Sequence, residues 1–220
     1  MQRIALAHVH LEDGAFTIEW VVIWTLIAAA LIAVALYRLG GYSIPTRKLA
    51  VAAMCVAVGF AIFQIEIPVF GGVHINLTPL IGILAGPSLG TLAVLVINMF
   101  GAAIGHGGWG MIGANLLVNL IEVIVAYTLF RALKKIFSGA FARGGIATFV
   151  SLFCGNLAMI AIILISEVQG VNQSKSQILA GLSLIAGVNM VAAIIEAVIT
   201  GMIITYILRM RPDMLENEHP

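Results

Sequence analysis

Long apolar runs, separated by short polar links, follow one another along almost the whole chain. A helix needs roughly 17–25 residues to cross a bilayer. The apolar runs of this chain predict helices at residues 18–37, 49–67, 77–87, 89–104, 111–133, 146–166 and 178–208. With 61% hydrophobic residues, 10% charged residues and a mean hydropathy of +1.11, the chain is typical of a membrane protein. We expect an all-α, multi-pass fold with one transmembrane domain (17–209), an N-terminal segment (1–16) and a polar tail (210–220).

Positive charges set the predicted orientation. With seven spans, nine of the eleven Lys and Arg residues lie on one side, namely Arg38, Arg47, Lys48, Arg131, Lys134, Lys135, Arg143, Arg209 and Arg211. The positive-inside rule makes that side cytoplasmic, so the N-terminus lies outside and the tail inside. The short, glycine-rich run at 77–87 is also compatible with a re-entrant segment. Six spans would, however, move the Arg131–Arg143 group outside and remove the bias, so we expect seven.

Four of the five histidines fall on the predicted outer side: His8, His10, His74 and His106. Neutral imidazole is the commonest metal ligand, so their gathering suggests a metal site, although outer loops also simply tolerate histidine. The segments GGVHINLTP (71–79) and GHGGWGMIGAN (105–115) each combine a histidine with glycines, which permit tight turns and close backbone approach. Imidazoles with few carboxylates suit Ni, Co, Cu or Zn better than Mg or Ca.

Signatures of catalysis are weak, and we expect a protein that is not an enzyme. The chain has neither the phosphate-binding GxxxxGK[ST] pattern nor HExxH. GPSLG (86–90) matches GxSxG, but it joins two predicted membrane helices, so a Gly/Pro turn is the simpler interpretation. Glu122 and Glu196 are predicted inside the membrane, where acids are costly and are functional candidates. A neutral carboxyl hydrogen-bonded to a neighbouring helix is an equally good interpretation of each.

Four segments resemble the CbiM/NikM family, the cobalt and nickel substrate-binding (S) components of energy-coupling-factor transporters. They are HLEDGAF (10–16), GGVHINLTPLIGILAGP (71–87), HGGWGMIGAN (106–115) and EAVIT (196–200). The resemblance implies a multi-pass subunit of the cell membrane that captures Co²⁺ or Ni²⁺ from outside, for cobalamin or metalloenzyme synthesis. It has no permanent cofactor, because the metal is its substrate. Its implied partners are an integral membrane T component, two ATP-binding-cassette ATPase subunits and a small accessory membrane subunit.

The resemblance also implies a four-nitrogen metal site. Family members begin Met-His and bind through the terminal amine, the next amide nitrogen, its imidazole, and an imidazole of the first outer loop. By motif, these nitrogens belong here to Val9, His10 and His74. A square-planar N₄ set suits Ni(II) or Cu(II), whereas the family's use in cobalt uptake favours cobalt. We choose cobalt narrowly over nickel.

Further residues are assigned by the same resemblance. Asn76, His106 and Asn115 are placed around the metal site. The small-residue ladder Ala53, Ala57 and Ala61 resembles the surface that contacts the T component, although ordinary packing between helices within the chain gives the same spacing.

The chain departs from the Met-His start of the family. It has Val9-His10 at the matching position, preceded by eight further residues that end in His8. Three interpretations stay open: Val9 is the true initiator, the chain is processed between His8 and Val9, or His8 replaces the amine. Two rival functions also stay open. A vitamin-binding S component would need an aromatic-lined pocket, and an intramembrane metallohydrolase would need a general base. The outer acids Glu12 and Asp13 are better explained as acids of a first helical turn.

Overall fold

The computed structural model describes residues 13–41, 43–64, 66–67, 73–105, 107–167 and 175–211. In this part of the chain the helices are α1 (Ile18–Gly40), α2 (Thr46–Phe63), α3 (Thr78–Ala103), α4 (Ile112–Ala132), α5 (Ala140–Ser166) and α6 (Lys175–Met210). Short 3₁₀ turns, η1 (Trp109–Met111) and η2 (Leu133–Lys135), flank α4, and the two-residue strands β1 (Glu66–Ile67) and β2 (Val73–His74) pair antiparallel. The predicted all-α, multi-pass fold is confirmed, because all six helices are long and apolar enough to cross a membrane.

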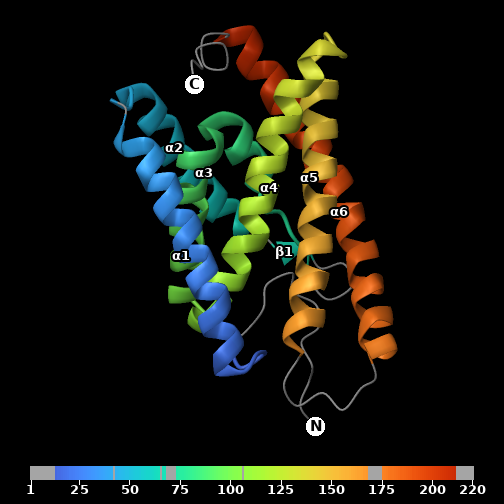
Figure 1. Cartoon of the computed structure of the whole chain (residues 1–220). Coiled ribbons are helices and arrows are strands. Elements are labelled where there is room, and N and C mark those ends of the chain that lie inside the picture. The colour runs from blue at the N-terminus through green and yellow to red at the C-terminus, as the bar shows by residue number, and fades with distance from the viewer. Residues whose placement is uncertain are drawn as a thin grey trace.

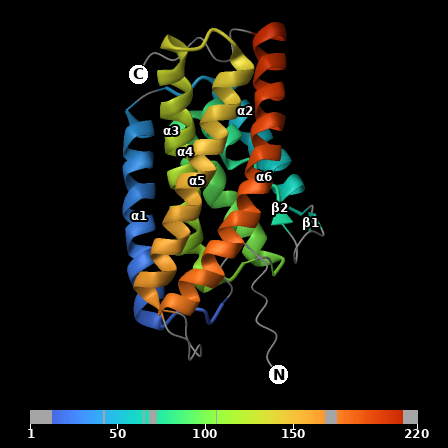
Figure 2. The same ribbon diagram turned by 90° about the vertical axis from the view of Figure 1, so that its right-hand side faces the viewer.

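The six helices run roughly along one axis and form an elongated bundle (Figures 1 and 2). α3 and α4 are the most buried helices, and α1, α2 and α6 are the least. Large apolar side chains on the outer helices are exposed, among them Leu26, Met54 and Met202. This distribution is what lipid requires, because hydrocarbon solvates apolar side chains and the helices satisfy their own backbone hydrogen bonds.

α3 is broken into two helical pieces at Gly86. This residue has φ 76° and ψ 176°, a conformation essentially limited to glycine, and Pro87 follows it. A Cβ on Gly90 would lie 3.7 Å from the Cα of Gly82. In a straight helix, residues eight apart are separated by about 12 Å. The chain therefore folds back on itself at Gly86, which is where the sequence predicted a Gly/Pro turn.

The seven predicted spans are corrected to six helices of membrane-spanning length in the described residues. The run predicted at 77–87 is instead the first piece of α3, from Thr78 to Ala85. At 1.5 Å per residue it is about 12 Å long, well short of the roughly 30 Å of a hydrocarbon core. It begins inside the bundle and not at the outer surface, which apolarity alone does not reveal.

Because the first piece of α3 is short, the basic residues still gather at one end of the bundle, as the sequence predicted. The C-terminal ends of α1, α4 and α6 and the N-terminal ends of α2 and α5 lie together at the upper end of the bundle in Figure 1. These ends carry all nine basic residues assigned to one side by the sequence, from Arg38 to Arg211. Their clustering is confirmed because the first piece of α3 rises to this end and the second piece returns. We call it the basic end.

We predict that Gly86→Ala lowers the free energy of unfolding by about 1–3 kcal/mol, because a Cβ is strained at φ 76°. Thermal unfolding of the detergent-solubilised chain measures the effect. The matched control is Gly181→Ala in α6, where a Cβ would meet no atom within 4 Å. Equal stability of both variants would contradict the backbone geometry at Gly86.

Candidate functional site

His74 ends the strand β2 and is buried, with 5% of its surface exposed. Its Nδ1 lies 3.0 Å from the carbonyl oxygen of Phe63, the last residue of α2, and the two rings lie 5.5 Å apart. A carbonyl only accepts, so Nδ1 donates, and in the neutral ring Nε2 keeps the lone pair. Metal-binding histidines are commonly oriented in this way through their other nitrogen.

The position of His74 corrects one expectation. The sequence placed it in an outer loop, whereas the structure places it in the strand β2, which pairs with Glu66–Ile67 at the edge of the bundle (Figure 2) and whose His74 side chain is buried. A buried imidazole is shielded from bulk water, which strengthens its interaction with a bound cation.

Asn76 joins three helices just before α3 begins. Its backbone N–H donates to Glu196 Oε1 of α6 at 3.3 Å, and its side-chain amide donates to Glu122 Oε2 of α4 at 3.3 Å. Its Oδ1 accepts from the backbone N–H of Thr78 at 3.0 Å, which forms an Asx turn leading into α3. The two membrane acids, which looked isolated in the sequence, therefore meet at one asparagine. Between Asn76 and α3, Leu77 has a left-handed φ of 50°, a strained conformation typical of functional sites.

A small cavity lies beside Asn76, with a volume of about 10 Å³, room for a single water. It is lined by Phe63, Asn76, Thr78, Val94, Ile97, Asn98, Gly101 and Asn119. The sequence placed Asn76 and Asn115 around the metal site, and of these two residues Asn76 lines the cavity. The other, Asn115, lies one turn before Asn119 on α4 and is buried, but does not line it.

The end of the bundle opposite the basic end joins two of the sequence motifs. Asp13 accepts hydrogen bonds from the backbone N–H groups of Trp109, at 3.2 Å, and Gly110, at 2.8 Å. A Cβ on Gly108 would lie 2.5 Å from the backbone nitrogen of Asp13, so only glycine fits there. Asp13 thus caps η1, ahead of α4, and not the first turn of α1 as the sequence suggested. His8, Val9, His10 and His106 lie outside the described residues.

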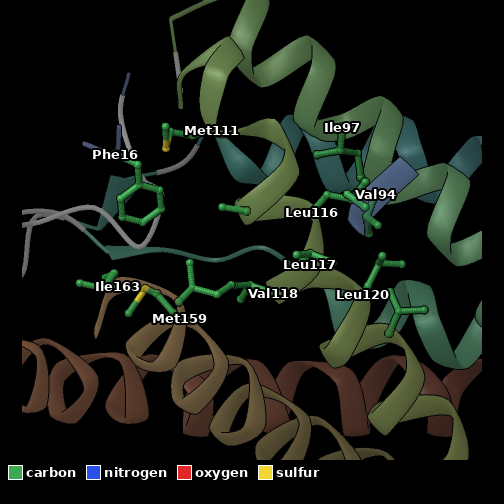
Figure 3. Close-up of a cluster of buried hydrophobic side chains, with 14 of the residues drawn as sticks. Phe16, Val94, Ile97, Met111, Leu116, Leu117, Val118, Leu120, Met159 and Ile163 are labelled. Carbon is green, nitrogen blue, oxygen red and sulfur yellow. The ribbon is translucent and has the colours of Figure 1, made fainter. Parts of the chain in front are cut away.

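Apolar packing holds the same segment against the bundle. Phe16, only 4% exposed, belongs to the cluster that contains Met111, Met159 and Ile163 (Figure 3). The side chains around it come from η1 and α5. Asp13 and Phe16 therefore fix the chain just after the predicted metal-capture residues.

We predict that Asp13→Ala lowers the free energy of unfolding by about 0.5–2 kcal/mol, because a helix start loses its cap. Asp13→Asn, which keeps one carbonyl oxygen, should lose less. Thermal unfolding of the two variants beside the wild type checks this order. The same loss in both would show that the charge, and not the hydrogen bonds, stabilises η1.

One family model matches almost the entire chain, from residue 10 to 214, and its description is "CbiM: Cobalt uptake substrate-specific transmembrane region". The chain belongs to the CbiM family. The family resemblance carried by the four sequence motifs is thereby confirmed. CbiM proteins are membrane proteins of cobalt and nickel transport and not enzymes, so the hydrolase alternative is set aside.

Two relatives illustrate the range of the CbiM family. "Putative cobalt transport protein CbiM 1" of Methanocorpusculum labreanum is 28% identical over 218 residues, covering 94% of this chain and 92% of that protein. "Putative fused nickel transport protein NikMN" of Archaeoglobus fulgidus is 26% identical over 217 residues, covering 95% of this chain and 68% of that protein. A solved structure described as a transition metal transporter shares the fold, with a TM-score of 0.79 over 92% of this chain and 93% of its own, at 18% identity.

Sequence reasoning named His74 and Asn76 as candidate site residues but missed the groups that contact them. The carbonyl of Phe63, the convergence of Glu122 and Glu196 on Asn76, and the capping by Asp13 all depend on contacts between distant segments. One local signal was present: Asn favours a turn two residues ahead, and Pro79 is compatible with the first turn of a helix. Within the described residues no group of three or more His, Cys, Asp or Glu side chains is placed to hold a metal ion.

Proposed function

We propose that this CbiM protein is the substrate-binding subunit of an ATP-driven energy-coupling-factor importer for Co²⁺, with Ni²⁺ as the alternative ion. The observation that carries the proposal is the buried imidazole of His74, whose Nδ1 is fixed by the Phe63 carbonyl. Such a ring presents its second nitrogen in a defined direction, as a metal ligand must. The imported metal would supply cobalamin or metalloenzyme synthesis.

The N-terminal segment is proposed to supply the other three nitrogens. An amine and the amide of residue 9, with the imidazole of His10, close one five-membered and one six-membered chelate ring, and His74 completes an N₄ set. The anchoring of Asp13 to Gly110 supports this set, because it holds the chain three residues after His10 against the bundle. The site would face the extracytoplasmic side, since Asp13 lies at the end opposite the basic end.

Energy and release are proposed to come from partners. The chain carries no phosphate-binding loop, so two ATPase subunits and a membrane T component would drive transport. Ala53, Ala57 and Ala61 are all exposed on α2, where they form a small-residue ladder facing outward. Their exposure argues against packing within the chain and supports α2 as the contact surface for a partner helix.

The vitamin alternative needs a pocket lined by aromatic side chains. The cavity beside Asn76 has room for a single water, and Phe63 is the one aromatic residue among the described residues that line it. A metal ion with a few ligand atoms needs far less space than a vitamin. Titration of the purified chain with Co²⁺ and Ni²⁺, by calorimetry and native mass spectrometry, tests the proposal. We expect one tightly bound ion per chain, and absence of tight binding for both ions would overturn it.

We predict that tight metal binding weakens as the pH falls, because amine, amide and imidazole must all shed or lack protons to coordinate. A free imidazole takes up a proton below about pH 6.5 and an α-amine below about pH 8. Affinity is therefore expected to fall steadily from pH 8 to pH 6, with protons taken up by the released ligands. Calorimetry in buffers of different ionisation enthalpy measures the protons exchanged. An affinity independent of pH would exclude an all-nitrogen site.

A further inference from the structure

We propose that Glu122 and Glu196 are positioning residues of the metal site. Through Asn76 they fix the segment that carries His74, and thereby the direction in which its imidazole meets an ion. This inference rests on the proposed function, in which His74 is a ligand of the metal. The two acids are not ligands themselves, and each acts through its hydrogen bond to Asn76.

Two sets of contacts hold the chain around His74. Its Nδ1 lies 3.0 Å from the carbonyl oxygen of Phe63 on α2, and β2 packs beside α6 (Figure 2). Asn76 donates through its backbone N–H to Glu196 Oε1 and through its side-chain amide to Glu122 Oε2, both at 3.3 Å. Two residues of chain span at most about 7 Å, so a shift of Asn76 moves His74 as well.

The acids are needed because this segment has no regular backbone partners. Residues 75–77 lie between β2 and α3 and belong to neither, so the N–H of Asn76 takes part in no ladder and no helix. Inside a membrane protein such a group must find its acceptor in the protein. Glu196 supplies it from α6, and Glu122 supplies an acceptor for the side-chain amide from α4. Both acids are only 3% exposed, so bulk water competes little for these bonds.

The backbone of Leu77 shows that the segment is held under constraint. Its φ of 50° is a left-handed conformation that a bulky residue rarely adopts. Strained conformations persist only where the surrounding structure fixes them. On one side Asn76 is bonded to both acids, and on the other the Leu77 side chain is buried in a cluster with Leu80 and Ile83. Loss of the bonds to Asn76 would let Leu77 relax and would turn the chain that leads back to His74.

Glu122 is itself held in place by α5. A Cβ on Gly155 would lie 2.7 Å from Glu122 Cγ, so only a glycine leaves room for this side chain. The carboxyl group is therefore confined between Gly155 and Asn76. Gly155→Ala should displace the carboxyl group from Asn76 without removing any polar group of the protein.

Calorimetric titration of the purified full chain with Ni²⁺ and with Co²⁺ tests the inference. Glu196→Ala and Glu122→Ala should each weaken the tight binding by about tenfold or more, because groups that orient a metal ligand typically contribute 10–100-fold to affinity. Glu196→Gln and Glu122→Gln keep a carbonyl acceptor at the same place and should restore most of the affinity. Gly155→Ala should weaken binding like Glu122→Ala, and it keeps the test open if an alanine variant of an acid fails to fold.

Ser166→Ala is the matched control. It removes the acceptor of another buried hydrogen bond between helices, which Trp24 Nε1 of α1 donates to Ser166 Oγ of α5 at 2.7 Å. α1 lies on the side of the bundle opposite β2 (Figure 2). Ser166→Ala should lower the melting temperature as Glu196→Ala does, but it should bind both metals like the wild type. A loss of affinity confined to the acid variants separates positioning from general stability.

A second readout needs no metal. In ¹⁵N NMR spectra of the chain labelled at histidine, His74 should show a single tautomer with its proton on Nδ1, because the Phe63 carbonyl accepts from that nitrogen. His74→Ala identifies the signals. Glu196→Ala should give a mixture of tautomers, since the ring is then released from the carbonyl, whereas Ser166→Ala should keep the single form.

Folded Glu196→Ala and Glu122→Ala chains with wild-type affinity and a single His74 tautomer would overturn the inference and leave the acids with a structural role alone. Gln variants as weak as the Ala variants would also count against it, because the negative charge and not the hydrogen bond would then be what matters. Equal metal binding by wild type and His74→Ala would refute the proposed function instead. A mixture of tautomers in Glu196→Ala would in that case still show that the acids position His74.

Discussion

His74→Ala is expected to weaken the tight binding of Co²⁺ and Ni²⁺ by more than about 100-fold. Loss of an outer-shell partner of a metal ligand already costs roughly 10–100-fold, and here the ligand itself is lost. The effect should be large because the imidazole is buried and its orientation is fixed by Phe63, so no solvent-exposed side chain can replace it without moving the strand. Calorimetric titration of wild type and variant measures the change.

The control for this variant is His219→Ala, which removes a histidine from the predicted cytoplasmic tail. It should bind both metals like the wild type. Melting temperatures of the two variants separate loss of the ligand from loss of the fold, since His74 also packs against Phe63. If His74→Ala stays folded and binds with wild-type affinity, His74 is not a ligand and the N₄ set is excluded.

The membrane fold was predictable because lipid acts on local sequence. Any run such as Ile18–Gly40 must be helical in hydrocarbon, whatever its neighbours do. The depth at which a helix starts in the membrane is determined by contacts with distant parts of the chain. α3 begins inside the bundle because Asn76 bonds to Glu122 and Glu196, which lie 46 and 120 residues away. An apolar sequence does not indicate the depth at which its helix begins, so residues 78–85 were predicted as part of a separate transmembrane helix.

In the candidate site, too, the local motif could be predicted from the sequence and the long-range contacts could not. His74 and Asn76 belong to a short motif, GGVHINLTP, and a motif can be read from the chain alone. The burial of His74 depends on the pairing of β1 with β2, and the acid pair depends on the packing of α4 and α6 around α3. Helix packing in membranes is set by small residues, such as Gly82 against the Val123 carbonyl. Glycines are too frequent here to show which pairs will meet.

The second large effect is expected at the proposed start of the metal site. A chain that begins Met-His10, made by removing residues 1–8 and replacing Val9→Met, should bind Co²⁺ or Ni²⁺ at least as tightly as any longer form. Acetylating the α-amine of that methionine converts the proposed ligand amine into an amide and leaves no free amine beside His10 to replace it. The five-membered chelate ring is then lost, and affinity should fall by about 100-fold or more.

The pair of chains is decisive because it changes no side chain of the bundle. Both keep Asp13, His10 and His74, so equal melting temperatures are expected and only the terminal nitrogen differs. If both bind equally, the amine is not a ligand. Binding by the full chain that is abolished by His8→Ala would then place the imidazole of His8 in the amine's position. Native mass spectrometry of the protein expressed from its own gene shows which of these chains the cell makes, and therefore which nitrogen the imported ion meets first.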